Sequence, residues 1–60
     1  MKVFIRDGDS WRFVPGPADL AGKRGDLLVV GEADEATASR WAAEIGIAVA
    51  LGANVFREEG

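Results

Sequence analysis

The chain has 60 residues, 48% of them apolar, and it contains two Trp and three Phe but no Cys, His or Tyr. The absence of Cys excludes disulfides, and the absence of both Cys and His argues strongly against a structural zinc site. The net charge is −3, and no basic stripe is present to neutralise phosphates, so we expect no nucleic-acid partner.

Residues 1–14 are predicted to form a β-hairpin. The segments Met1–Ile5 and Asp9–Val14 are rich in β-branched and aromatic residues, and the turn signal Asp7-Gly8 lies between them. A two-residue loop at Asp7-Gly8 would mix apolar and charged side chains on both faces. We therefore favour a three-residue loop, Arg6-Asp7-Gly8, which pairs Val3 with Trp11.

The favoured register separates the hairpin into an apolar face and a more polar face. The apolar face would carry Met1, Val3, Ile5, Trp11 and Phe13, and the polar face would carry Lys2, Phe4, Ser10, Arg12 and Val14. Phe4 and Val14 would then be apolar groups on the polar face. This placement makes them candidates for contacts with another chain, whereas Trp11 could serve either the core or an interface.

Residues 15–26 form the one long connector. Pro15 ends the preceding strand, and Pro17 predicts a short helical turn in which Leu20 packs against the sheet. Long loops are often functional or mobile. Lys23 and Arg24 lie in this loop and are candidates for contacting an anion if the loop closes over a ligand.

Leu27–Val30 is a continuous apolar run, which predicts a strand covered on both faces. A helix is expected to follow, with Asp34 as its N-cap and Glu35 in its first turn. Apolar residues then recur at helical spacing and form the predicted buried stripe, which consists of Ala38, Trp41, Ala42 and Ile45.

The end of this helix has two interpretations. If Gly46 ends it, Ile47–Leu51 is a strand and completes a right-handed parallel crossover with Leu27–Val30. If the helix continues to Leu51, Gly52 ends it and the sheet is mainly antiparallel. We favour the strand, and we expect a short last strand at 54–57 in either case.

The predicted fold class is α+β, in a single domain spanning residues 1–60. An N-terminal β-hairpin and a central strand form a sheet, with one helix packed across it. The favoured interpretation of residues 47–51 adds a βαβ crossover in the C-terminal half. The chain contains no run of 18 apolar residues, and its N-terminal apolar stretch is too short for a signal peptide. We therefore expect a cytoplasmic protein without membrane contact.

No catalytic, cofactor-binding or metal-binding residues are predicted. Without His, Cys or Tyr, the usual general bases and strong nucleophiles are missing. Asp7 and Asp9 flank a turn, and Glu32, Asp34 and Glu35 gather at a helix start, which are positions that acidic residues favour for structural reasons. We therefore predict a protein that is not an enzyme and uses no cofactor.

The leading functional hypothesis is a small protein–protein interaction or assembly module. A chain of this length buries only about 60% of its unfolded surface, and neither disulfides nor zinc can compensate, so we expect a homo-oligomer that associates through its sheet. Residues 1–30 carry five basic and four acidic groups, and residues 31–60 carry two basic and six acidic groups. Pairing between these oppositely charged halves is one interpretation, and a solvated surface is the simpler one. The candidate contact residues are Phe4, Trp11, Val14 and Phe56.

The alternative hypothesis is a regulatory domain that binds a small molecule and acts with a larger partner. Its ligand would be an anionic metabolite, held by Lys23 and Arg24 in the long loop.

Overall fold

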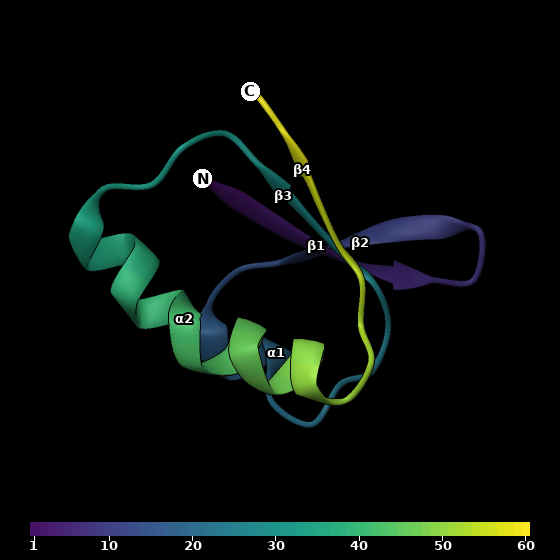
Figure 1. Cartoon of the computed structure of the whole chain (residues 1–60). Coiled ribbons are helices and arrows are strands. Elements are labelled where there is room, and N and C mark those ends of the chain that lie inside the picture. The colour runs from purple at the N-terminus through teal and green to yellow at the C-terminus, as the bar shows by residue number, and fades with distance from the viewer.

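The structure is a computed structural model that describes residues 1–60. Its four strands lie in one sheet in the order β2-β1-β3-β4, and both helices lie on the same side of that sheet (Figure 1). The predicted α+β fold is confirmed. In chain order the elements are β1 Lys2–Asp7, β2 Ser10–Val14, α1 Pro17–Leu20, β3 Leu27–Val30, α2 Glu35–Ala50 and β4 Val55–Glu58.

The N-terminal hairpin is present, but its loop differs from both loops considered above. Asp7 pairs with Ser10, so the loop consists of Gly8-Asp9 alone. Gly8 has a φ of +62°. A glycine at the first central position is typical of the type II′ turn, whose twist matches that of the flanking strands. The three-residue loop and the Asp7-Gly8 loop were therefore both wrong.

The observed register reassigns the faces of the hairpin. Val3 pairs with Val14, which puts both on the face that the helices cover. Phe4 pairs with Phe13, and these two rings lie on the opposite face. The prediction that Trp11 and Phe13 share a face with Val3 was wrong, and Val14 was assigned to the wrong face. The difference arises because this register places compact aliphatic side chains beneath the helices.

The C-terminal half forms a crossover in which β3 and β4 are parallel neighbours joined by α2. The predicted crossover is therefore present, but its second strand is Val55–Glu58 and not Ile47–Leu51. The helix runs through Gly46 to Ala50, so the favoured end at Gly46 was wrong. The alanines around Gly46 are strong helix formers, and they offset the intrinsic cost of one glycine.

Helix α2 ends in a Schellman motif. The Gly52 N–H donates to the Val49 carbonyl and the Ala53 N–H donates to the Ala48 carbonyl, both at 3.0 Å. Gly52 has a φ of +98°, which is the left-handed conformation that this position requires. The alternative end at Gly52 is therefore the observed one.

The start of α2 agrees with the sequence prediction. The Asp34 carboxylate accepts a hydrogen bond of 2.8 Å from the Thr37 backbone N–H. This bond stabilises the ionised carboxylate and lowers the pKa of Asp34 from its ordinary value of 3.8. A second carboxylate, that of Asp26, accepts hydrogen bonds from the backbone and side-chain amides of Asn54. It thereby joins the residues that precede β3 and β4.

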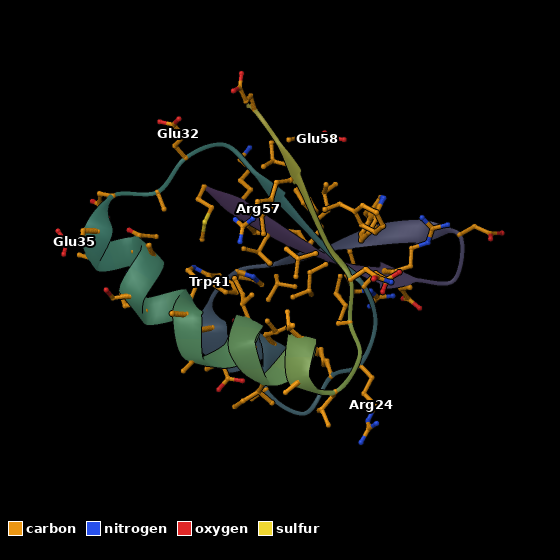
Figure 2. All side chains as sticks on the ribbon, viewed as in Figure 1. Arg24, Glu32, Glu35, Trp41, Arg57 and Glu58 are labelled. Atoms are coloured by element: carbon orange, nitrogen blue, oxygen red, sulfur yellow. The ribbon has the colours of Figure 1, made fainter.

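The core lies between the sheet and the two helices. Leu20 of α1 and Trp41 of α2 are buried there, as predicted, and Figure 2 shows Trp41 pointing from α2 toward the sheet. The helical stripe is rotated from the prediction, because Ala38 and Ala42 are exposed whereas Ala48 packs against the core. The buried residues are Val3, Ile5, Val14, Leu20, Leu27, Val29 and Trp41.

Candidate interaction surface

The sheet has an inner face, which the helices cover, and an outer face, over which no helix lies (Figure 1). Successive side chains of a strand point to opposite faces, so the pairing register assigns each residue to one of them. We define the outer face by its strand residues, which are Lys2, Phe4, Arg6, Trp11, Phe13, Leu28, Val30, Phe56 and Glu58.

Four large apolar side chains cross the outer face in one line, which we call the apolar row. Phe13 pairs with Phe4, Phe4 pairs with Leu28, and Leu28 pairs with Phe56. Phe13 is 52% exposed and Phe56 is 51% exposed, although they are among the largest apolar residues of the chain. The apolar row therefore extends from one edge of the sheet to the other without a covering element.

Aromatic contacts hold the outer face in a defined arrangement. The Phe4 and Phe13 ring centroids are 5.7 Å apart, and the Trp11 and Phe56 centroids are 6.3 Å apart in an edge-to-face geometry. Trp11 and Phe56 belong to the two edge strands, so these side chains meet above the strands between them. Such rings lose little conformational freedom when a partner binds them.

Arg6 lies over the face of the Trp11 ring. Its guanidinium carbon lies 5.3 Å from the Trp11 ring centroid, and its Nε donates a 2.9 Å hydrogen bond to the Gly8 carbonyl. A guanidinium within about 6 Å of an indole ring is attracted by the negative charge density of the ring face. The outer face thus combines ordered rings with a fixed positive charge.

The structure brings three of the four candidate contact residues together. Phe4, Trp11 and Phe56 all lie on the outer face, whereas Val14 is 2% exposed and belongs to the core. The sequence interpretation missed Phe13, which it placed on the apolar face of the hairpin. The dipeptide Gly8-Asp9 could have located it, because Gly-Asp is a two-residue hairpin loop in its own right.

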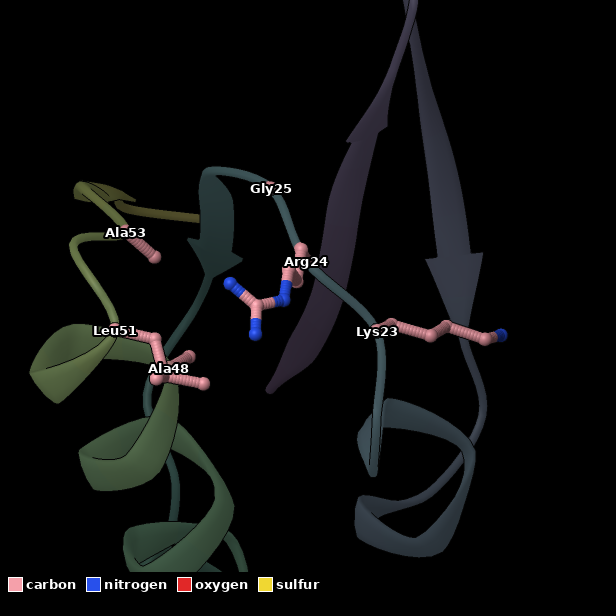
Figure 3. A pocket seen from close by; sticks show the side chains of 6 residues that line it. All are labelled: Lys23, Arg24, Gly25, Ala48, Leu51 and Ala53. Carbon is pink, nitrogen blue, oxygen red and sulfur yellow. The ribbon is translucent and has the colours of Figure 1, made fainter.

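The side chains of the two candidate anion contacts point in opposite directions. Lys23 and Arg24 both line a pocket with a volume of about 30 Å³, which holds only one or two water molecules. Figure 3 shows the Arg24 guanidinium turned toward Ala48 and Leu51 of the α2 end, while Lys23 extends in the opposite direction. The anion-binding hypothesis stays a prediction, and this pocket offers no paired clamp for an anion.

A wider open hollow of about 300 Å³ lies beside the hairpin. It is lined by Ile5, Arg6, Asp7, Arg12, Lys23 and Arg24. Its one carboxylate, that of Asp7, forms an ion pair with Arg12. This pair is exposed and neutralises part of the positive charge that an anion would meet.

A second apolar area lies at the C-terminal end of α2. Ile47, Val49 and Leu51 are each more than half exposed. Positions two residues apart in a helix point to nearly opposite sides, so Val49 does not share a stripe with the other two. This area is less continuous than the apolar row.

Comparisons with known proteins identify no relative. No family model matches the chain, and no match was found among the curated proteins or the solved structures. No group of three or more His, Cys, Asp or Glu side chains is placed to hold a metal ion. Neither helix has the length and apolar character needed to cross a membrane.

Proposed function

We propose that this chain is a small cytoplasmic assembly module that associates with a second copy of itself through the outer face of its sheet. It acts by making contacts and not by catalysis. The observation that carries the proposal is the uncovered apolar row, whose two end members, Phe13 and Phe56, are each half exposed. Aromatic residues of this kind are enriched in the centres of protein interfaces.

The surface of the isolated chain supports the same proposal. Only seven of the 60 residues are buried, and the accessible surface is 4110 Å². A folded monomer of 6.4 kDa is expected to expose about 3,800 Å². The excess is consistent with a fold whose second sheet face is left for another molecule to cover.

Face-to-face packing of two such sheets produces a familiar arrangement. Two twisted sheets stack about 10 Å apart with their strands inclined by about 30°, and their inward side chains interdigitate. Four strands spaced about 4.8 Å apart give a face on the order of 20 Å wide, and two such faces bury on the order of 1,000 Å² together. This area is at the low end for specific complexes, so we expect a reversible dimer.

The proposal is tested by analytical ultracentrifugation of the wild-type chain and of Phe13→Ser. We expect a concentration-dependent dimer, and we expect Phe13→Ser to weaken it by about 100-fold, because symmetry removes two aromatic anchors at once. Circular dichroism at low concentration should show that the variant still folds, since Phe13 is already half exposed.

Ile47→Ser is the matched control. Ile47 is apolar and 54% exposed like Phe13, but it lies on α2 and away from the outer face. Its substitution should leave the dimer unchanged. A wild-type chain that remains monomeric at several hundred micromolar, or an equal loss of association in both variants, would refute the proposal.

A further inference from the structure

The charged groups of the outer face are arranged asymmetrically. Its two basic residues, Lys2 and Arg6, both lie on β1. Glu58 lies on β4, in the same cross-strand row as Lys2, with Val30 between them. Asp26 precedes β3 next to Arg6, whose backbone N–H donates to the Asp26 carbonyl, and the Asp26 carboxylate accepts hydrogen bonds from Asn54 before β4. One half of the outer face is therefore basic and the other half is acidic.

We infer that a two-fold axis relates the two copies of the dimer. This axis lies between the two facing sheets, runs parallel to the strands, and passes midway between β1 and β3. This inference rests on the proposed self-association and specifies its geometry. The rotation places β1 of one copy over β3 of the other, and β2 over β4. The apolar row then lies on its own symmetry mate, with Phe13 over Phe56 and Phe4 over Leu28 of the second copy.

The same rotation pairs the charges. Arg6 of one copy lies over the position of Asp26 in the second copy. Lys2 lies beside Glu58 of the second copy, because the rotation brings β4 next to β1. Each contact occurs twice by symmetry. Within one chain, Lys2 and Glu58 are separated by a whole strand and form no ion pair, so both charges are available to the second copy.

The other face-to-face arrangement has its axis perpendicular to the strands and opposes like charges. That rotation places β1 over β1 and reverses the direction of the strands. Lys2 would then face Arg6 of the second copy, and Glu58 would lie beside Asp26. Like charges directly opposite each other in an interface are unfavourable and act against the wrong partner orientation. Complementary charge therefore selects the axis parallel to the strands.

A charge-swap experiment tests this geometry. Lys2→Glu alone places two acidic groups together in each symmetric pair, and Glu58→Lys alone places two basic groups together. We expect each variant to dimerise about tenfold more weakly than the wild type at low ionic strength, and we expect the loss to shrink in about 0.5 M salt. An equimolar mixture of the two variants restores both pairs, so native mass spectrometry should show the heterodimer as the dominant dimer.

Arg40→Glu and Glu44→Lys are the controls, because they make the same changes of charge on α2. Neither should alter dimerisation, and their mixture should show no preference for the heterodimer. If Lys2→Glu strengthens the dimer, or if the mixture of the outer-face variants shows no heterodimer preference, the geometry is wrong while self-association stands. A monomeric wild-type chain would overturn both.

Discussion

The inner and outer faces of this sheet are made by neighbouring residues of the same strands, yet they differ in side-chain type and in cover. The inner face is aliphatic, with Val3, Val14 and Val29 buried beneath the helices. The outer face is aromatic, and its end members Phe13 and Phe56 stay half exposed. The comparison shows that the two helices of this 60-residue chain cover one face of the sheet only, and the second face stays uncovered.

The largest expected effect comes from adjacent leucines on β3 that belong to opposite faces. Leu27 is fully buried, whereas Leu28 belongs to the apolar row. We expect Leu27→Ala to lower the free energy of unfolding by about 2–5 kcal/mol through cavity formation. Because the whole domain is expected to have only about 3–9 kcal/mol of stability, this variant should lose a large share of it and unfold at a much lower urea concentration than the wild type.

Leu28→Ala is the matched comparison. Urea unfolding at a concentration where the chain is monomeric should show a smaller loss in the free energy of unfolding for Leu28→Ala than for Leu27→Ala, because part of the Leu28 side chain is already exposed. Leu28→Ala should instead weaken dimerisation. Equal losses of stability for the two leucines would contradict the division into a packed face and an uncovered face.

A smaller effect is expected at a glycine that borders the inner face. Gly25 has a φ of +143°, and a Cβ there would lie 3.1 Å from the Arg6 carbonyl oxygen and 3.4 Å from Ile5 Cγ1. We expect Gly25→Ala to cost about 1–3 kcal/mol, because backbone strain and close contact add. Thermal unfolding would measure this loss.

Gly8→Ala provides the control for Gly25. Gly8 also has a positive φ, of +62°, but a Cβ there would meet no atom within 4 Å. Gly8→Ala should therefore lower the stability of the fold only through the conformational strain of alanine at a positive φ. If Gly8→Ala lowered the unfolding temperature more than Gly25→Ala did, close packing around residue 25 would not explain the need for glycine there.

The smallest effect concerns the helix that covers the inner face. The hydrogen bond from the Thr37 N–H lowers the pKa of Asp34, so ionised Asp34 stabilises the fold. This contribution is fully present above the ordinary Asp pKa of 3.8 and is lost as the pH falls through the lower folded-state value. Asp34→Ala should unfold at a slightly lower temperature than the wild type near neutral pH, and this difference should shrink in acid.

Thermal unfolding of the wild type and Asp34→Ala from about pH 7 to about pH 2 tests the expected trend. Asp34→Asn serves as the control, since it keeps a side-chain oxygen acceptor without the titrating group. A temperature difference that is the same throughout this range would show that the ionised cap does not contribute.

Several elements could be predicted from the sequence because their signals are local. The N-cap at Asp34, the turn at Pro17 and the apolar strand at Leu27–Val30 depend on residues within a few positions of each other, and all three are present. Trp41 was correctly predicted to be a core residue, because it is a large apolar side chain within the apolar stripe of an amphipathic helix.

The errors came from choices that tertiary packing decides. Asp7-Gly8 and Gly8-Asp9 are both acceptable hairpin loops, and shifting the loop from the three-residue form to Gly8-Asp9 moves every β2 side chain to the other face. Local propensity left Ile47–Leu51 between helix and strand, and the capping geometry at Gly52 favoured the helix. The candidate surface was found in part because Phe4 and Phe56 stood out individually, while the apolar row depends on pairing between distant strands.

The parallel placement of β4 has a consequence for the order of folding. Residues 26 and 54, whose hydrogen bonds join the starts of β3 and β4, are 28 positions apart, whereas the hairpin closes over two residues. Closing the longer loop costs more entropy, so β4 should join the sheet late. Phe56 lies on β4, so the apolar row is complete only after β4 has paired with β3. The proposed dimer would therefore form only between copies whose sheet is complete.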